Sequence, residues 1–171
     1  MHIYFSGIGG VGLGPLAELA RDAGYEVSGS DTSASLMTDQ LQASGVTISF
    51  EQSTEAITRL HQSAPIDWLV HTAAIDEHHP EIVFAKKHAI KVSKRDELLA
   101  HIITEKKLSL IAVSGTHGKT TTSGMMVWAL QQAKIPVSYS IGSQISFGPS
   151  GAYDPASQYF VYECDEYDRN F

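Results

Sequence analysis

Short apolar runs alternate with helical patterns along the first hundred residues of the chain. The run at residues 66–74 is almost continuously apolar, which is typical of a strand covered on both faces of its sheet. The helical patterns begin at proline or a polar residue, and two of them end at Gly24 and Gly45. Such alternation predicts an α/β fold, in which crossover helices connect the strands of a parallel sheet. The expected strands are residues 2–6, 25–31, 46–50, 66–74 and 90–93, and the expected helices are residues 15–23, 35–45, 54–62, 80–88 and 95–105.

The alternation starts again after residues 104–107, a lysine-rich segment with the composition of a linker. Residues 146–158 are rich in Gly, Pro and Ser and are expected to form a loop. Three strands and one helix cannot cover both faces of a sheet, so we expect this second domain to be incomplete. The predicted domains are residues 1–104 and 108–171. The elements expected in the second are strands at 108–113, 136–142 and 158–163 and a helix at 120–132.

Composition narrows the class of protein. Of the 171 residues, 43% are hydrophobic and 18% are charged, as in ordinary soluble globular proteins. A net charge of −7 without a basic cluster argues against binding to nucleic acid. No apolar run approaches the roughly 20 residues of a membrane span, and the N-terminus lacks the pattern of a signal peptide. With Cys164 as the single cysteine, we expect a cytoplasmic protein without an internal disulfide or a membrane partner. His78 and His79 precede Pro80 in an expected loop and favour solvated surface histidine over a metal site.

A glycine pattern follows the first expected strand and opens the first helix. Gly7, Gly9 and Gly12 form G-x-G-x-x-G, whose backbone can approach a diphosphate at the positive end of the helix. Asp31 ends the second strand at the spacing expected of an acid that binds a ribose. The pattern does not distinguish NAD from a UDP-linked sugar. A close turn between strand and helix, without any ligand, is the alternative interpretation.

A second glycine loop has the topology of a phosphate-binding loop. Val113 stands where the strict pattern has its first glycine, but the chemistry of the remaining positions is retained. Lys119 can place its ammonium on the β- and γ-phosphates, and Thr120 can ligate Mg²⁺. A glycine turn with a solvated lysine is the alternative. The expected ATP-binding residues are Gly115, Thr116, His117, Gly118, Lys119, Thr120 and Thr121.

The last expected strand ends in acids. Because ligands gather at the carboxyl ends of parallel strands, Glu163 is expected near the phosphate loop, where it can hold Mg²⁺. Unpaired buried carboxylates are costly, so this acidic cluster requires a cation or solvent. A solvated loop is the alternative for the acids that follow. They are Asp165, Glu166 and Asp168.

Three segments, "GIGGVGLGPLAELARDAGYEVSGSD", "AVSGTHGKTTTSGM" and "ECDEYDRNF", together resemble the Mur ligases of peptidoglycan synthesis. The resemblance covers nearly the whole chain. It implies a Rossmann-like UDP-binding domain followed by the start of a P-loop ATPase domain. It also implies an ADP-forming ligase that joins an amine to the carboxylate of UDP-N-acetylmuramate through an acyl phosphate. The resemblance leaves open whether the amine is L-alanine or belongs to a peptide.

The resemblance also implies roles for particular residues, with ATP and Mg²⁺ as cofactors. Lys119 and His117 would be catalytic, and Thr120 and Glu163 would hold the metal. Ala73 departs from a position where the family tends to have serine, so one contact to the uridine is missing there. The residues implied for the UDP-sugar are Gly7, Gly9, Gly10, Gly12, Asp31, His71 and Thr72.

Two other classes of function stay open on the sequence. An NAD-binding oxidoreductase or sensor is compatible with the first glycine loop and Asp31, but leaves residues 115–122 unexplained. A nucleotide-binding module without catalysis is the second, although the residues of the phosphate loop are intact. Because part of the active site would be missing, we expect the chain alone to be inactive as a ligase.

Overall fold

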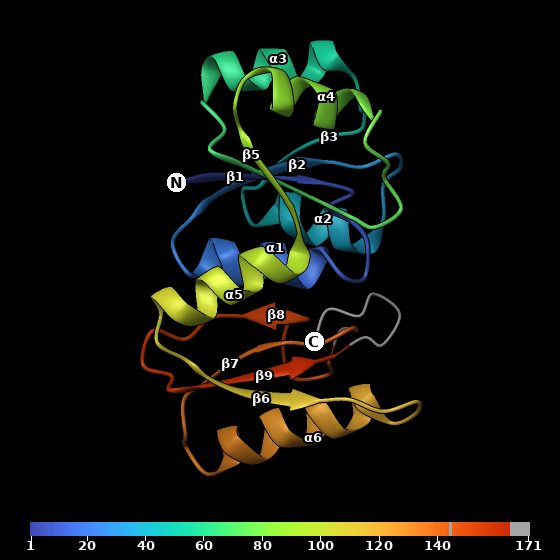
Figure 1. Ribbon diagram of the computed structural model, residues 1–171. Helices are drawn as coiled ribbons and strands as arrows, with labels where there is room; N and C mark the ends of the chain where they lie inside the picture. The colour runs from blue at the N-terminus through green and yellow to red at the C-terminus, as the bar shows by residue number, and fades with distance from the viewer. Residues whose placement is uncertain (144, 165–171) are drawn as a thin grey trace.

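The computed structural model describes residues 1–143 and 145–164 and contains two sheets, one above the other, with helices between them and on their outer faces (Figure 1). The first sheet is fully parallel, with the strand order β3-β2-β1-β4-β5. Ile3 of the central strand lies between Val27 and Trp68 of its neighbours. This order confirms the predicted α/β fold. The strands are β1 (His2–Ser6), β2 (Glu26–Ser30), β3 (Thr47–Ser49), β4 (Trp68–His71) and β5 (Lys91–Lys94).

Helices cover both faces of the first sheet. Side chains alternate along β1, so Ile3 and Phe5 lie in one buried cluster with α1 and α5, whereas Tyr4 lies in another with α3 and α4. Polar residues begin two of the helices, because the hydroxyls of Ser35 and Ser53 accept hydrogen bonds from first-turn amides. The helices are α1 (Gly14–Asp22), α2 (Leu36–Ala43), α3 (Thr54–Ser63), α4 (Pro80–Lys87) and α5 (Arg95–Glu105).

The second sheet has the order β6-β9-β7-β8. β6, β9 and β7 are parallel, whereas β8 pairs antiparallel with β7. The expectation that residues 146–158 form only a loop is therefore wrong, because they contain β8. Its two residues add an edge strand that the Gly- and Pro-rich composition conceals. The elements are β6 (Ser109–Val113), α6 (Lys119–Gln132), β7 (Val137–Ser140), β8 (Gly151–Ala152) and β9 (Tyr159–Glu163).

Both faces of the second sheet are covered. Val127 of α6 packs on one face, and Phe160 and Tyr162 of β9 share the buried cluster of α1 and α5 on the other. The second sheet's own helix thus covers one face, and α1, which also packs on the first sheet, covers the other. That the second domain is incomplete stays a prediction. Helix α5 ends at Glu105, as expected. The division into domains at residues 104–108 stays a prediction.

A buried carboxylate ties α1 to β8. One oxygen of Glu18 accepts hydrogen bonds from the hydroxyl of Ser150 and the amide of Gly151, both at 2.9 Å. A β-carbon on Gly151 would lie 1.9 Å from the carbonyl oxygen of Pro15, so a side chain there would separate the strand from the helix. None of the helices in the described part of the chain is both long and apolar enough to span a bilayer.

Candidate functional site

The first glycine loop joins β1 to α1 and is held by its own neighbours. The amide of Gly9 donates to a carboxylate oxygen of Asp31 at 2.8 Å, and the other oxygen accepts from the amide of Thr32 at 2.7 Å. Among the described residues, the amides of Val11 and Gly12 make no hydrogen bond. The part of this loop open to an anion is therefore its second half.

Asp31 and the first half of the loop border a cavity of about 450 Å³. Gln52 also lines it and donates through Nε2 to the hydroxyl of Ser30 at 3.1 Å. The sequence analysis missed Gln52, although its place just after β3 follows the rule that ligands gather at carboxyl ends of strands. Lining residues predicted from the sequence are Gly7, Gly9, Gly10, Asp31 and Thr72.

A second cavity, of about 240 Å³, lies against the other half of the loop. His71 and Thr72 line it, and Nδ1 of His71 lies 3.0 Å from the carbonyl oxygen of Thr72. Lys94 and Arg95 line it as well and were not predicted from the sequence. Both lie where β5 ends and α5 begins, so the rule on strand ends could have found them too. Gly10 and Gly12 complete the set of predicted residues here.

A buried acid lies beneath the first loop, at the ends of β1 and β2. Glu81, in the first turn of α4, accepts hydrogen bonds from Tyr4 at 2.6 Å, from Ser30 at 2.9 Å and from Ser6. Burial, followed by the charge of Glu81, raises the pKa of Tyr4. The phenol therefore stays protonated and donates. This network fixes the strand ends from which the loop departs.

The second glycine loop is open by comparison. Gly118 takes a left-handed conformation, with φ of 78°, and forms the N-cap of α6. The first amide that bonds within the helix belongs to Thr122, which donates to Gly118 at 2.9 Å, so the preceding helix amides point out of the helix start. Lys119 donates from Nζ to the carbonyl of Gly115 at 2.7 Å. Thr116, His117 and Thr121 are exposed, and their roles stay predictions.

The two residues predicted to hold Mg²⁺ lie together. Thr120 donates from Oγ1 to Glu163 at 2.8 Å, and the amide of Gly142 donates to the other carboxylate oxygen at 3.0 Å. A hydroxyl and a carboxylate fit Mg²⁺, which prefers oxygen ligands and is held by few protein groups beside water and phosphate. The described residues contain no cluster of three or more His, Cys, Asp or Glu side chains suited to a metal. Asp165, Glu166 and Asp168 lie outside the described residues.

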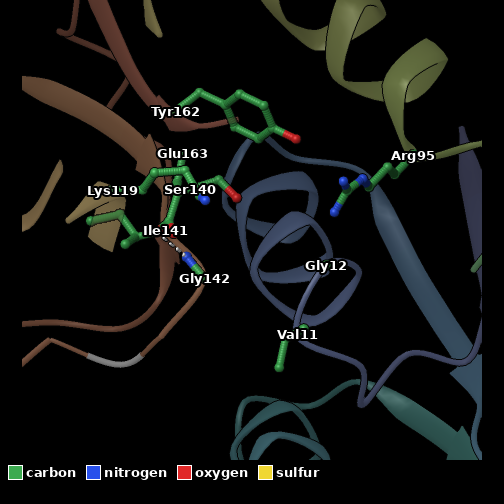
Figure 2. A pocket seen from close by; sticks show the side chains of 9 residues that line it. All are labelled: Val11, Gly12, Arg95, Lys119, Ser140, Ile141, Gly142, Tyr162 and Glu163. Atoms are coloured by element: carbon green, nitrogen blue, oxygen red, sulfur yellow. Dashed lines mark hydrogen bonds between the residues drawn. The ribbon is translucent and has the colours of Figure 1, made fainter. Parts of the chain in front are cut away.

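A cavity of about 200 Å³ brings the two loops together (Figure 2). Val11, Gly12 and Arg95 line it from the side of the first sheet, and Lys119 and Glu163 line it from the second. Burial raises the pKa of the adjacent Cys164, while the positive charge of Arg95 opposes that effect. The thiol is thus kept neutral beside this cavity. A cavity with two cationic side chains, at the carboxyl ends of parallel strands from both sheets, suits anionic groups.

Comparison with known proteins agrees with this arrangement. Residues 2–107 match the protein family described as "Mur ligase family, catalytic domain". The chain belongs to the Mur ligase family. UDP-N-acetylmuramate–L-alanine ligase of Agathobacter rectalis is 39% identical over 171 residues, which are 100% of this chain and 36% of that protein. The chain thus spans about a third of the length of such relatives.

Two solved structures of Mur ligases share the arrangement of both sheets. UDP-N-acetylmuramate:L-alanyl-γ-D-glutamyl-meso-diaminopimelate ligase from Neisseria meningitides has a TM-score of 0.84 and 30% identity, over 98% of this chain and 53% of that one. UDP-N-acetylmuramate-alanine ligase from Thermotoga maritima also has a TM-score of 0.84, with 28% identity over 95% of this chain and 36% of that one. The family resemblance expected from the sequence is confirmed.

Proposed function

We propose that this Mur ligase chain forms part of an ADP-forming ligase that joins L-alanine to the carboxylate of UDP-N-acetylmuramate. The observation that carries the proposal is the cavity shared by the two glycine loops, with Lys119 and Glu163 on one side and Gly12 on the other. One loop would hold the diphosphate of the sugar nucleotide, and the other would hold ATP. The names of the relatives support this choice of substrate.

The proposed reaction requires two anions to approach each other. The muramyl carboxylate attacks the γ-phosphate of ATP, which gives an acyl phosphate and ADP, and the amine then displaces inorganic phosphate from the carbonyl. Lys119 would leave the carbonyl of Gly115 and place its ammonium on the phosphates. Helix amides before Thr122 would receive phosphate oxygens. Neutralising charge as it develops is the main contribution expected of such a site.

Thr120 and Glu163 would hold Mg²⁺ through oxygen atoms. When bound, the ion would neutralise phosphate charge and orient the phosphates for in-line transfer. The amide of Gly142 keeps the carboxylate of Glu163 aimed at Thr120. The expectation of ATP and Mg²⁺ as cofactors rests on this donor set and on the loop.

A tripeptide amine is the second candidate for the acceptor. The similarity in fold to the ligase from Neisseria meningitides, whose name contains L-alanyl-γ-D-glutamyl-meso-diaminopimelate, favours it. The described residues all lie in the part of the molecule that would bind UDP-N-acetylmuramate and ATP. Both candidates therefore use the same proposed site and differ in the amine alone.

The test uses the protein in its full natural length. We expect ADP release that requires UDP-N-acetylmuramate together with either L-alanine or the tripeptide, and competition between them identifies the amine. Labelling the muramyl carboxylate with ¹⁸O should transfer one label to inorganic phosphate, because the carboxylate oxygen leaves with the phosphate. NADH is included as a ligand in the same binding measurements. Binding of NADH without any binding of UDP-N-acetylmuramate would overturn the proposal.

A further inference from the structure

Arg95 is a charged side chain that lies at the junction of two cavities. It begins α5 and lines both the cavity with His71 and the cavity with Lys119. A β-carbon on Gly12 would lie 2.5 Å from its Nη1, so the guanidinium lies directly over the first glycine loop. None of the motifs in the sequence includes this residue, and the names of the relatives give it no role.

Arg95 also reaches the second sheet. Its charge acts on Cys164, the residue that follows β9. Figure 2 shows the side chain extending toward the cavity from the side opposite Lys119 and Glu163. The first sheet therefore contributes a cation to a cavity whose other charged groups come from the second sheet.

We propose that Arg95 binds the carboxylate of the sugar nucleotide and positions it for attack on the γ-phosphate. This inference rests on the proposed function. The attacking oxygen must lie about 3–3.5 Å from phosphorus before reaction, so the carboxylate has to enter the cavity that Lys119 lines. Of the described lining residues from the first sheet's side, Val11, Gly12 and Arg95, Arg95 alone is charged. A guanidinium matches a carboxylate with two parallel hydrogen bonds.

The neighbouring Lys94 sharpens the assignment. It lines the cavity with His71 and Thr72 but not the one with Lys119. We assign Lys94 to the diphosphate, together with the amides of Val11 and Gly12, and Arg95 to the carboxylate. UDP-N-acetylglucosamine carries the same nucleotide and diphosphate but lacks the carboxylate, so it separates the two assignments.

The experiment measures affinity for both sugar nucleotides by calorimetry, in the protein of full natural length. Arg95→Ala should weaken the binding of UDP-N-acetylmuramate by about 10- to 100-fold, as expected for the loss of a charge-assisted contact. It should weaken the binding of UDP-N-acetylglucosamine by less than about threefold. Arg95→Lys should give an intermediate loss, because lysine keeps the charge but not the fork of donors. Lys94→Ala is the matched control and should lower the affinity for both sugar nucleotides by the same factor.

If Arg95→Ala lowers the affinity for both sugar nucleotides equally, the residue is assigned to the diphosphate and the inference is overturned. Unchanged affinity for both would overturn it as well. If Arg95→Ala does not fold by circular dichroism, Arg95→Gln takes its place with the same expected selectivity. Failure of the unchanged protein to bind UDP-N-acetylmuramate would instead count against the proposed function.

Discussion

The two glycine loops join a parallel strand to a helix in the same way, but their surroundings differ. At the first loop, β-carbons on Gly7 and Gly9 would each lie 2.8 Å from a threonine methyl, and Asp31 already occupies the amide of Gly9. At the second, a β-carbon on Gly118 would meet nothing within 4 Å. The first loop is packed against its own protein over half its length, whereas the second is open.

Glycines in loops of the same topology therefore serve two different structural needs. In the first loop, Gly7 and Gly9 allow close packing, and the amides of Val11 and Gly12 remain for the proposed diphosphate. In the second, the glycine at position 118 shapes the backbone, and the proposed chemistry falls to Lys119 and Thr120.

Removing the cation of the open loop should have the largest effect. Lys119→Ala is expected to lower kcat by about 1,000-fold in the ligase assay, because charge developing on the phosphates loses its preorganised partner. Lys87, an exposed residue of α4 far along the chain from the loop, is the control, and Lys87→Ala should leave kcat within about twofold. A loss below tenfold for Lys119→Ala would show that the second loop is not the reactive one.

Glu163→Gln tests the metal side of the open loop. We expect a loss of about 100-fold in kcat/KM at low Mg²⁺, because the amide is a weaker ligand than the carboxylate. A Mg²⁺ titration should restore part of the activity at higher concentration. Glu55→Gln, on the exposed start of α3, is the matched control. An unchanged Mg²⁺ dependence in Glu163→Gln would remove this residue from the proposed metal site.

Alanine substitutions compare the packing of the two loops directly. Gly7→Ala should cost about 2 kcal/mol of unfolding free energy, because φ of 88° is strained for alanine and the new methyl would meet Thr72. Gly118→Ala carries the strain of φ of 78° alone and should cost about 1 kcal/mol. Denaturant unfolding measures both. Gly24→Ala, with φ of 92° and open space around it, should match Gly118→Ala. Equal costs at all three positions would contradict the contrast in packing.

Sequence patterns predict single helices and strands well. They predict poorly which distant helix covers a given sheet face. Helix α3 begins at Thr54 as expected, because Ser53 caps it, and β1 coincides with its apolar run. The short strand β8 was missed, because two residues carry no period of their own and pair only once β7 is in place. Cover of the second sheet by α1 could not be predicted, because it depends on contacts between residues more than a hundred positions apart.

The candidate site divides in the same way. Residues within one loop, such as Gly118 and Lys119, could be found from spacing, because a loop's ligand contacts are local in sequence. The pairing of Thr120 with Glu163 was expected from the rule on strand ends, and the structure brings the two side chains together. Arg95 was not found, although the rule on strand ends points to its position after β5. Its place over Gly12, in contrast, depends on how the end of β5 meets the first loop.

The smallest expected effect concerns the contact that fixes one loop relative to the other. Glu18 lies in the helix that the first loop opens, and its partners are Gly151 of β8, in the sheet that carries the second loop, and the preceding Ser150. Burial raises the pKa of Glu18, and the two hydrogen bonds oppose that rise in part. The folded state therefore binds a proton more readily than the unfolded state, so this group's contribution to stability falls as pH rises from 4.5 through the folded pKa.

Glu18→Gln keeps the shape and an acceptor oxygen but cannot ionise. We expect its unfolding free energy to differ from that of the unchanged protein by less than about 1 kcal/mol. The difference should shift in favour of glutamine as pH rises from 4.5 through the folded pKa of Glu18, because glutamine does not carry the cost of a buried charge. Glu26→Gln, at an exposed strand start, should show no such trend. If the unfolding free energy of the unchanged protein instead rises relative to that of Glu18→Gln as pH rises, the carboxylate is stabilised as an anion. The charged form would then hold α1 and β8 together more strongly.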